Sequence, residues 1–228
     1  MSEVGPVHIM GAGLSGLAAA TTLAKSGVEV HVHDLRKDSG QRFDGDFQAL
    51  ENWSMDEDFF DQLRNWGYDP NEFKATEFNA VDLIHPDDEI TEAVSSKVAY
   101  RIVERGTSEH TIDQGFKRMA ISAGANLHYG SKVKEEDCQI IACGPKGTSA
   151  VAYGEIFRTK HPNHIAFQLN DKLAPGSYSY LIIIDGIGLI CTCLWRKQRG
   201  TERFLNETIA WYQRNYPDID MEPIKRVG

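Results

Sequence analysis

The sequence has few cysteines, no excess of basic residues and no long uninterrupted apolar run. Its 24 Lys and Arg are outnumbered by 33 Asp and Glu, which gives a net charge of −9. Because nucleic-acid binding requires a clustered positive field, this balance argues against a nucleic-acid partner. The longest apolar run, Leu181 to Leu194, contains Asp185 and two glycines. It is shorter than the roughly 20 residues of a bilayer-spanning helix, so we expect no transmembrane segment.

The N-terminus shows neither the basic nor the apolar region of a signal peptide, which predicts a cytoplasmic protein. Cys138, Cys143, Cys191 and Cys193 do not form paired Cys-x-x-Cys motifs. We therefore expect free thiols in a reducing compartment, with Cys191 and Cys193 buried and inert. The sequence contains no Gly-x-Ser-x-Gly motif, which removes the case for a serine hydrolase.

The first 34 residues carry the pattern of a βαβ unit. Val7–Met10 is a short apolar run that stops at a glycine, as a buried parallel strand does. Leu14–Lys25 is rich in alanine and leucine and is followed by Gly27, which predicts a helix with a glycine at its C-terminal end. Val28–His33 alternates between apolar and polar residues and predicts a second strand. Such a strand–helix–strand unit is right-handed.

Beyond this unit the pattern changes several times. Residues 40–46 form a predicted loop, and Ser54 with Glu57 forms a predicted capping box before a helix that starts near Phe59. Residues 73–103 alternate around an acidic turn, which predicts antiparallel strands. The other predicted elements are a helix from Ile112 to Ala120, strands at Asn126–Tyr129 and Gln139–Cys143, a hairpin of Leu181–Ile184 and Leu189–Leu194, and a helix at Phe204–Tyr212.

The alternation of α/β and β segments predicts two interleaved domains. We expect an α/β fold, α+β overall, in which a Rossmann-like dinucleotide-binding βαβ domain is interleaved with a mainly antiparallel β domain. The dinucleotide-binding domain is predicted to comprise residues 1–72 and 100–160. The second domain, residues 73–99 and 161–228, is expected to carry the substrate.

Gly11, Gly13 and Gly16 form a Gly-x-Gly-x-x-Gly motif between the first strand and helix. The first glycine permits the tight turn, the second lets the backbone approach a pyrophosphate, and the third lets helix and strand pack closely. The helix N-terminus then presents unpaired N–H groups to the phosphates. Asp34 ends the second strand, where a carboxylate accepts hydrogen bonds from ribose hydroxyls and disfavours a 2′-phosphate. The spacing predicts a dinucleotide site and leaves FAD and NAD both open.

The stretch from Val7 to Asp34 resembles the FAD-binding start of the p-hydroxybenzoate hydroxylase-like flavoprotein superfamily. Asp137–Gly147 is similar to that superfamily's second signature, a strand that runs into Ala-x-Gly-Pro and passes the flavin. The resemblance implies FAD as the cofactor, and it assigns no catalytic residue. The cofactor-binding residues that it implies are Gly11, Ala12, Gly13, Leu14, Ser15, Gly16, Asp34, Leu35, Arg36, Arg42, Arg105, Cys143, Gly144 and Pro145. A solvated loop position remains the alternative for Arg42.

Within this superfamily the sequence resembles the geranylgeranyl reductase family at Arg42–Gly45, from Gly144 to Gly154, and at Pro175–Tyr180. The resemblance implies FAD-dependent reduction of C=C bonds in a prenyl chain or another hydrophobic substrate. NAD(P)H or ferredoxin is the expected electron donor, and a quinol-linked donor also remains open. A lipid substrate would suit peripheral membrane contact, although no basic amphipathic helix indicates it. The candidate lining for an apolar substrate channel, with ordinary sheet core as the alternative, consists of Tyr178, Tyr180, Ile182, Ile184 and Trp195.

One family feature is not found. The third motif of the family, Gly-Asp-Ala after the substrate domain, does not occur before Gly228. Three explanations remain: the sequence belongs to a longer protein, the missing lobe is supplied otherwise, or flavin binding is compromised. Two further functions therefore stay open. One is an FAD-dependent monooxygenase that uses NAD(P)H and O2, and the other is a non-catalytic dinucleotide-binding remnant.

Two histidine pairs are weighed as metal ligands. His31 and His33 lie two residues apart on one strand face, but no third ligand is evident, so we expect packed or solvent-facing strand residues. His161 and His164 flank a Pro-Asn turn and are expected in a surface loop.

Overall fold

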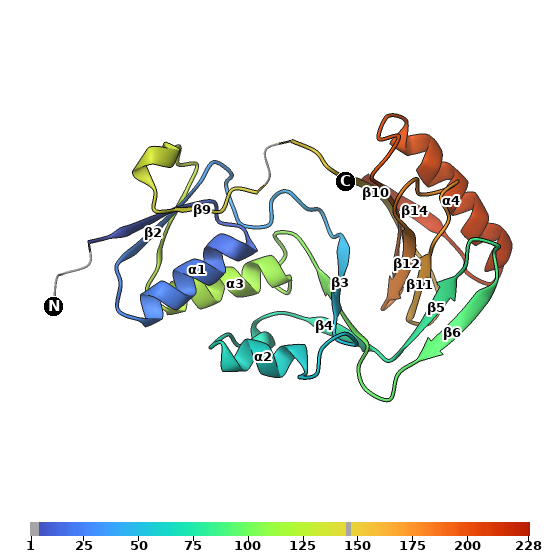
Figure 1. Ribbon diagram of the computed structural model, residues 1–228, viewed down its shortest axis with the longest axis horizontal. Helices are drawn as coiled ribbons and strands as arrows, with labels where there is room; N and C mark the ends of the chain where they lie inside the picture. The colour runs from blue at the N-terminus through green and yellow to red at the C-terminus, as the bar shows by residue number, and fades with distance from the viewer. Residues whose placement is uncertain (1–4, 145–146) are drawn as a thin grey trace. The chain divides into compact units, whose positions relative to one another are not determined.

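The computed structural model describes residues 5–144 and 147–228, which form a mixed α/β fold with one parallel sheet and two further sheets (Figure 1). The predicted fold class is confirmed. The chain divides into two compact units. Unit 1 consists of Met1–Gln48, Met55–Ala75 and Val103–Lys146, and unit 2 consists of Ala49–Ser54, Thr76–Ile102 and Gly147–Gly228.

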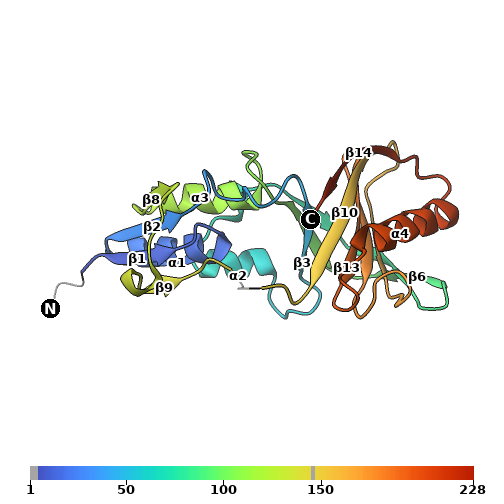
Figure 2. The same ribbon diagram turned by 90° about the horizontal axis from the view of Figure 1, so that it is seen from above.

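Unit 1 is built on a parallel sheet in the order β8-β2-β1-β9 (Figure 2). Its strands are β1 (Val7–Met10), β2 (Val30–Asp34), β8 (Asn126–Tyr129) and β9 (Ile140–Ile141), and the 3-10 helix η2 (Glu135–Asp137) joins the last two. Helix α1 (Leu14–Lys25) packs on β1 and β2, and α3 (Ile112–Ser122) packs beside α1 (Figure 1). Ile9, Val30 and Val32 are fully buried, since a parallel strand covered by a helix is apolar on that face. The predicted βαβ unit is confirmed.

Helix α2 (Phe59–Asn65) has a different cap from the predicted one. The N-cap is Asp58, whose carboxylate accepts a hydrogen bond from the Phe60 N–H at 2.8 Å. The predicted capping box of Ser54 and Glu57 is therefore wrong, and Glu57 instead accepts a hydrogen bond from the Asn65 side chain. The 3-10 helix η1 (Pro70–Glu72) follows α2. Three short strands, β3 (Phe47–Glu51), β7 (Tyr100–Glu104) and β4 (Ala75–Phe78), form a sheet in that order.

Unit 2 is built on a sheet in the order β14-β10-β13-β12-β11-β5-β6, in which the pair β11 and β5 is parallel and the other pairs are antiparallel. Helix α4 (Thr201–Asn215) runs beside this sheet (Figures 1 and 2), and its Leu205 and Tyr212 share one buried apolar cluster with Leu181, Ile183 and Ile190. The strands are β5 (Ala80–Ile84), β6 (Ile90–Val94), β10 (Val151–Arg158), β11 (His164–Gln168), β12 (Ser179–Ile184), β13 (Ile187–Leu194) and β14 (Glu222–Val227).

The hairpin of β12 and β13 is confirmed, and its turn shows why the sequence predicted it. Asp185 has φ 50° and Gly186 has φ 82°, the two positive values that a type I′ turn requires. Strand β10 pairs with β13 and β14, whereas the sequence placed residues 151–158 with the dinucleotide-binding part. Strand β9 covers only Ile140–Ile141 of the longer strand predicted there. The prediction of a loop at His164 is wrong, because this residue begins β11.

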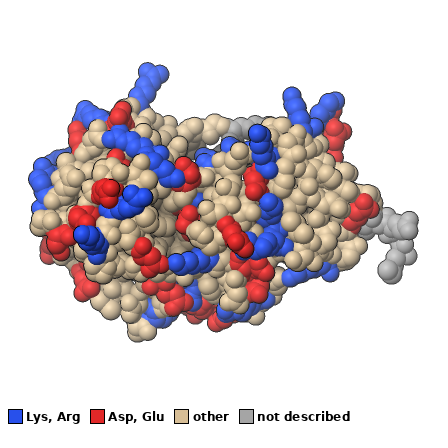
Figure 3. All heavy atoms as spheres, turned by 180° about the vertical axis from the view of Figure 1, so that it is seen from behind, with Lys and Arg blue, Asp and Glu red and all other residues tan. Residues whose placement is uncertain are grey.

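Basic and acidic side chains are interspersed over the face drawn in Figure 3. Within residues 5–144 and 147–228, no helix has the length and apolar character needed to cross a membrane.

The cap of α2 can be tested by substitution. Asp58→Ala removes the acceptor for the Phe60 N–H, and we expect it to lower the free energy of unfolding by about 1 kcal/mol. Ser54→Ala is the matched control and is expected to change it by less than about 0.5 kcal/mol. Urea unfolding followed by circular dichroism measures both. The reverse ranking would restore Ser54 as the cap.

Candidate functional site

The turn between β1 and α1 is shaped by close backbone contacts. A Cβ atom on Gly16 would lie 1.9 Å from the Gly11 carbonyl oxygen, and one on Gly11 would lie 2.5 Å from the Ala142 carbonyl oxygen. Gly11 also has φ 105°, which a side chain disfavours. Gly13 differs, because a Cβ atom there would meet nothing within 4 Å. Gly11 and Gly16 therefore serve packing, whereas the open side of Gly13 leaves room for a ligand.

The N-terminus of α1 begins at Gly13, its N-cap residue. Among residues 5–144 and 147–228, no side chain caps this end of the helix, and its first turn contains no acidic residue. The N–H groups of a first turn lack intrahelical partners and form the positive end of the helix dipole. This end of α1 is therefore suited to an anion such as a pyrophosphate.

Asp34 connects the ends of β1 and β2. One carboxylate oxygen accepts a hydrogen bond from the Ala12 N–H and the other accepts from the Arg36 N–H, both at 2.8 Å. The carboxylate thus holds the glycine-rich turn next to the chain that leaves β2. Since an ionised carboxylate offers about four lone pairs, Asp34 can accept further hydrogen bonds from a ligand hydroxyl.

A cavity of about 830 Å³ in unit 1 brings most of the predicted residues together. Gly16 does not line it, because it packs against the Gly11 backbone. Pro145 lies outside the described residues. A second cavity, of about 880 Å³, lies near the C-terminal ends of α1 and α3 and is lined by none of the predicted residues. The predicted residues that line the first cavity are Gly11, Ala12, Gly13, Leu14, Ser15, Asp34, Leu35, Arg36, Arg42, Arg105, Cys143 and Gly144.

Arg105 lines this cavity and is also held in a buried network. Its Nε and Nη2 atoms donate to the two carboxylate oxygens of Asp113 at 2.8 Å, and Nη1 donates to Gln48 at 2.7 Å. The guanidinium carbon lies 4.0 Å from the centre of the Phe43 ring. The Asp113 side chain is only 1% exposed. Three of the five guanidinium N–H groups are used in this way, so two remain for a ligand.

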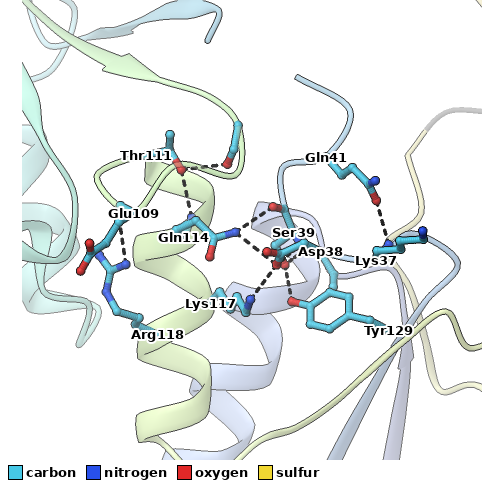
Figure 4. Close-up of polar contacts among 12 residues, drawn as sticks. Lys37, Asp38, Ser39, Gln41, Glu109, Thr111, Gln114, Lys117, Arg118 and Tyr129 are labelled. Atoms are coloured by element: carbon cyan, nitrogen blue, oxygen red, sulfur yellow. Dashed lines mark hydrogen bonds and ion pairs between the residues drawn. The ribbon is translucent and has the colours of Figure 1, made fainter. Parts of the chain in front are cut away.

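Polar residues after β2 also line the cavity, and the sequence analysis did not select them. The Asp38 carboxylate accepts hydrogen bonds from Lys117 at 2.6 Å and Gln114 at 3.2 Å, both on α3 (Figure 4). The Ser39 hydroxyl donates to the Ala12 carbonyl at 2.8 Å and lies 2.6 Å from the Tyr129 hydroxyl. The i, i+3 spacing of Gln114 and Lys117 placed both on one helix face, but nothing local indicated their partner.

These contacts shift the pKa of Asp38. Burial alone would raise it, but the hydrogen bonds from Lys117, Gln114 and the Ser39 N–H outweigh burial and lower the pKa below its ordinary value. A carboxyl group with a lowered pKa stabilises the folded state above its unfolded pKa, and this stabilisation is lost as the pH falls through the lowered value. The Asp38 network thus fixes the loop after β2 to α3 at neutral pH.

The remaining candidates lie elsewhere. No group of three or more His, Cys, Asp or Glu in the described ranges is arranged to hold a metal ion. All four cysteines are free thiols, with Cys191 buried and Cys193 half-buried. A hydrogen bond with Cys191 lowers the pKa of the Cys193 thiol despite its burial. Tyr178 and Tyr180 lie in an aromatic cluster of unit 2 that also contains Phe167.

The packing role of Gly16 and the ligand-facing role of Gly13 can be distinguished by substitution. Gly16→Ala forces a Cβ atom into the Gly11 backbone and is expected to lower the free energy of unfolding by about 1 to 3 kcal/mol. Gly13→Ala meets no atom, and as an N-cap change it should lower this free energy by less than about 1 kcal/mol. Thermal unfolding of both variants measures the difference. Equal destabilisation would contradict the assignment of Gly16 to packing and Gly13 to the ligand side.

The two cavity arginines should also behave differently. Arg105→Ala leaves the buried Asp113 carboxylate without its cation, and we expect the free energy of unfolding to fall by about 3 to 5 kcal/mol. Arg42 is exposed, so Arg42→Ala is the matched control and should change this free energy by less than about 0.5 kcal/mol. Urea unfolding measures both. An Arg105→Ala protein as stable as the wild type would show that this ion pair does not stabilise the fold.

The chain is similar to known proteins in sequence over a short segment and in fold over nearly its whole length. Residues 9–46 match the family of NAD(P)-binding Rossmann-like domains. Over 43 residues the chain is 51% identical to hydroxysqualene dehydroxylase from Rhodopseudomonas palustris, an alignment covering 19% of this chain and 10% of that protein. A geranylgeranyl bacteriochlorophyll reductase-like protein from Thermoplasma acidophilum superposes with a TM-score of 0.68 and 16% identity, over 98% of this chain and 65% of that one.

A second solved structure extends the comparison to hydroxylases. Aklavinone-11 hydroxylase in complex with FAD and aklavinone superposes with a TM-score of 0.60 and 14% identity, over 98% of this chain and 52% of that one. The chain therefore spans about half to two thirds of the length of these solved proteins. At these identities the superpositions establish the fold. Residues 9–46 thus match a family of NAD(P)-binding Rossmann-like domains, and the chain shares the fold of these two solved proteins.

Proposed function

We propose that this chain forms the cofactor-binding part of an FAD-dependent oxidoreductase. One observation carries the proposal: the uncapped N-terminus of α1, the open side of Gly13, the Asp34 carboxylate and the Cys143–Gly144 segment border one cavity. An uncapped helix end suits a pyrophosphate, and a carboxylate suits ribose hydroxyls. The residues present therefore fit a dinucleotide.

In this proposal, different cavity residues bind different parts of the cofactor. The backbone of Gly11–Gly16 binds the pyrophosphate, and Asp34–Arg36 binds the adenosine end. Arg42, Arg105 and Cys143–Gly144 face the remainder of the molecule. Bound FAD would supply the hydride transfer, whereas the protein binds it, orients it and balances its charge. The extent of the cavity from the glycine turn to Arg42 and Arg105 supports FAD over a smaller nucleotide.

The finer proposal concerns the substrate, which we infer to be a prenyl-type or other hydrophobic molecule with a reducible C=C bond. Unit 2 carries a cluster of Tyr100, Phe167, Tyr178 and Tyr180, with ring centroids 5.3 to 6.4 Å apart. Aromatic side chains of this kind suit an apolar ligand. The names of the dehydroxylase and reductase-like relatives support the same substrate class. NAD(P)H or ferredoxin is the proposed electron donor, and the cytoplasm is the proposed location.

A second candidate is an FAD-dependent monooxygenase that uses NAD(P)H and O2. The similarity in fold to aklavinone-11 hydroxylase favours it. The two reactions differ in their use of oxygen. Rapid NADPH oxidation stimulated by an aromatic compound would support the monooxygenase, and slow oxidation in air would support the reductase.

Binding of FAD can be tested directly. We expect the purified chain to bind FAD, and Gly13→Ala to raise the dissociation constant at least about tenfold because its Cβ atom occupies the space left for the phosphates. Gly5→Ala is the matched control, since a Cβ atom there also meets nothing within 4 Å and Gly5 does not line the cavity. Visible absorption and fluorescence titration measure both variants. A folded chain that cannot be loaded with FAD would favour the non-catalytic remnant.

A further inference from the structure

Four histidines occupy one face of the parallel sheet in unit 1. In β1 and β2 the buried Ile9, Val30 and Val32 alternate with His8, His31 and His33, which therefore point to the face opposite α1. His8 is the register partner of His31, and His33 is the register partner of His128 on β8. Three adjacent strands thus contribute imidazoles to one array.

The array consists of two hydrogen-bonded pairs. His8 Nδ1 lies 3.1 Å from His33 Nε2, and His31 Nδ1 lies 2.9 Å from His128 Nε2. The rings of the first pair are inclined by 21° and those of the second by 17°, with centroids 5.4 and 5.2 Å apart. The laterally adjacent rings, His8 with His31 and His33 with His128, have centroids 5.1 and 4.8 Å apart. The four rings are therefore nearly parallel and each contacts two others.

Each pair can hold only a limited number of protons while its hydrogen bond persists. A neutral imidazole has one N–H donor and one acceptor nitrogen, whereas an imidazolium has two donors. A neutral pair and a singly charged pair both keep one proton between the facing nitrogens. A doubly charged pair places two N–H groups against each other, so its hydrogen bond is lost and two positive charges face each other at about 3 Å.

The remaining hydrogen-bond partners of the array are consistent with this limit of one added proton per pair. The Glu29 carboxylate accepts from His31 Nε2 at 2.9 Å, and the Ser131 hydroxyl lies 3.0 Å from His33 Nδ1. Among the described residues, Glu29 is the charged group hydrogen-bonded to the array. Burial lowers the pKa of His33, and the neighbouring His128, His8 and His31 lower it further. One carboxylate can compensate one positive charge, but not four.

We propose that this imidazole array is a pH-sensitive element that weakens the dinucleotide-binding sheet on acidification. The folded array accepts one proton per pair, or two in total, whereas the same four histidines accept four protons in the unfolded chain. Because the unfolded state binds more protons below the ordinary histidine pKa of about 6.5, stability decreases as the pH falls through that value.

The array is joined to the proposed cofactor site. His33 and Ser131 line the same cavity as the glycine-rich turn. The Ser131 N–H also donates to the backbone carbonyl of Asp34 at 2.9 Å. Opening of the His8–His33 pair therefore loosens the strand end that carries Asp34. The link to cofactor release rests on the proposed function, but the loss of sheet stability does not.

Amide hydrogen exchange of β1 and β2 in the chain without added cofactor tests the proposal. Between pH 6.5 and 5, after correction for intrinsic exchange rates, we expect the opening constant of these strands to rise by up to about 100-fold per pH unit, as a difference of two protons requires. The double variant His8→Gln/His128→Gln leaves one histidine in each pair, so the pH dependence that arises from the pairing should be lost. A shallower slope should remain, because burial still lowers the pKa of His33. His85→Gln is the matched control, an exposed histidine of unit 2, and should retain the wild-type slope.

Two results would overturn the proposal. One is an equal pH slope for the wild-type and double-variant sheets. The other is an imidazole ¹⁵N titration of the folded wild-type chain in which all four rings become fully protonated by pH 5.5. This titration needs no variant, so it decides the question even if the double variant does not fold. FAD release on acidification is a separate readout. A chain that binds FAD at neutral pH but retains it at pH 5 would contradict the link between the array and the cofactor site, whereas a folded chain that binds no FAD at neutral pH would count against the proposed function alone.

Discussion

Helix α1 begins so close to the turn after β1 that a methyl group cannot fit between them. The Gly16 position touches the Gly11 carbonyl, and Gly11 in turn touches the backbone that leaves β9. This close packing directs the first N–H groups of α1 to the cavity and leaves Gly13 open beside them. The suitability of this site for an anion thus results from backbone packing rather than from a charged side chain.

Side-chain contacts then fix the surroundings of the turn. Asp34 holds it from the end of β2, and Ser39 holds it through the Ala12 carbonyl. The pair of Arg105 and Asp113 fixes the start of α3 on the other side of the cavity. A buried ion pair contributes little net stability over an apolar contact, but it specifies geometry strongly, because each partner is costly to leave alone. These contacts consequently hold the residues around the cavity in one arrangement.

Local patterns predicted the local parts of this structure. The glycine spacing, the apolar run of β1 and the Asp-Gly turn after β12 each depend on neighbouring residues, and each was found as expected. The contacts of Asp38 with Lys117, the edge strand β14 and the four-histidine array join residues from distant parts of the chain. No periodicity carries that information. The α2 cap was mispredicted because Ser54 and Asp58 both have suitable side chains, and only the backbone direction selects between them.

The discontinuity of unit 1 has a consequence for how the chain acquires its structure. Strands β1 and β2 pair with β9 and β8, which lie about a hundred residues further along the sequence. During synthesis the glycine-rich turn therefore emerges well before the strands that complete its sheet. The unit 2 segments Ala49–Ser54 and Thr76–Ile102 are made in between. Contacts of such long sequence separation slow folding, because the loop must close before they contribute. The sheet built on the N-terminal βαβ segment is consequently incomplete until β8 and then β9 have been made, and its strand edges lack their partners until that point.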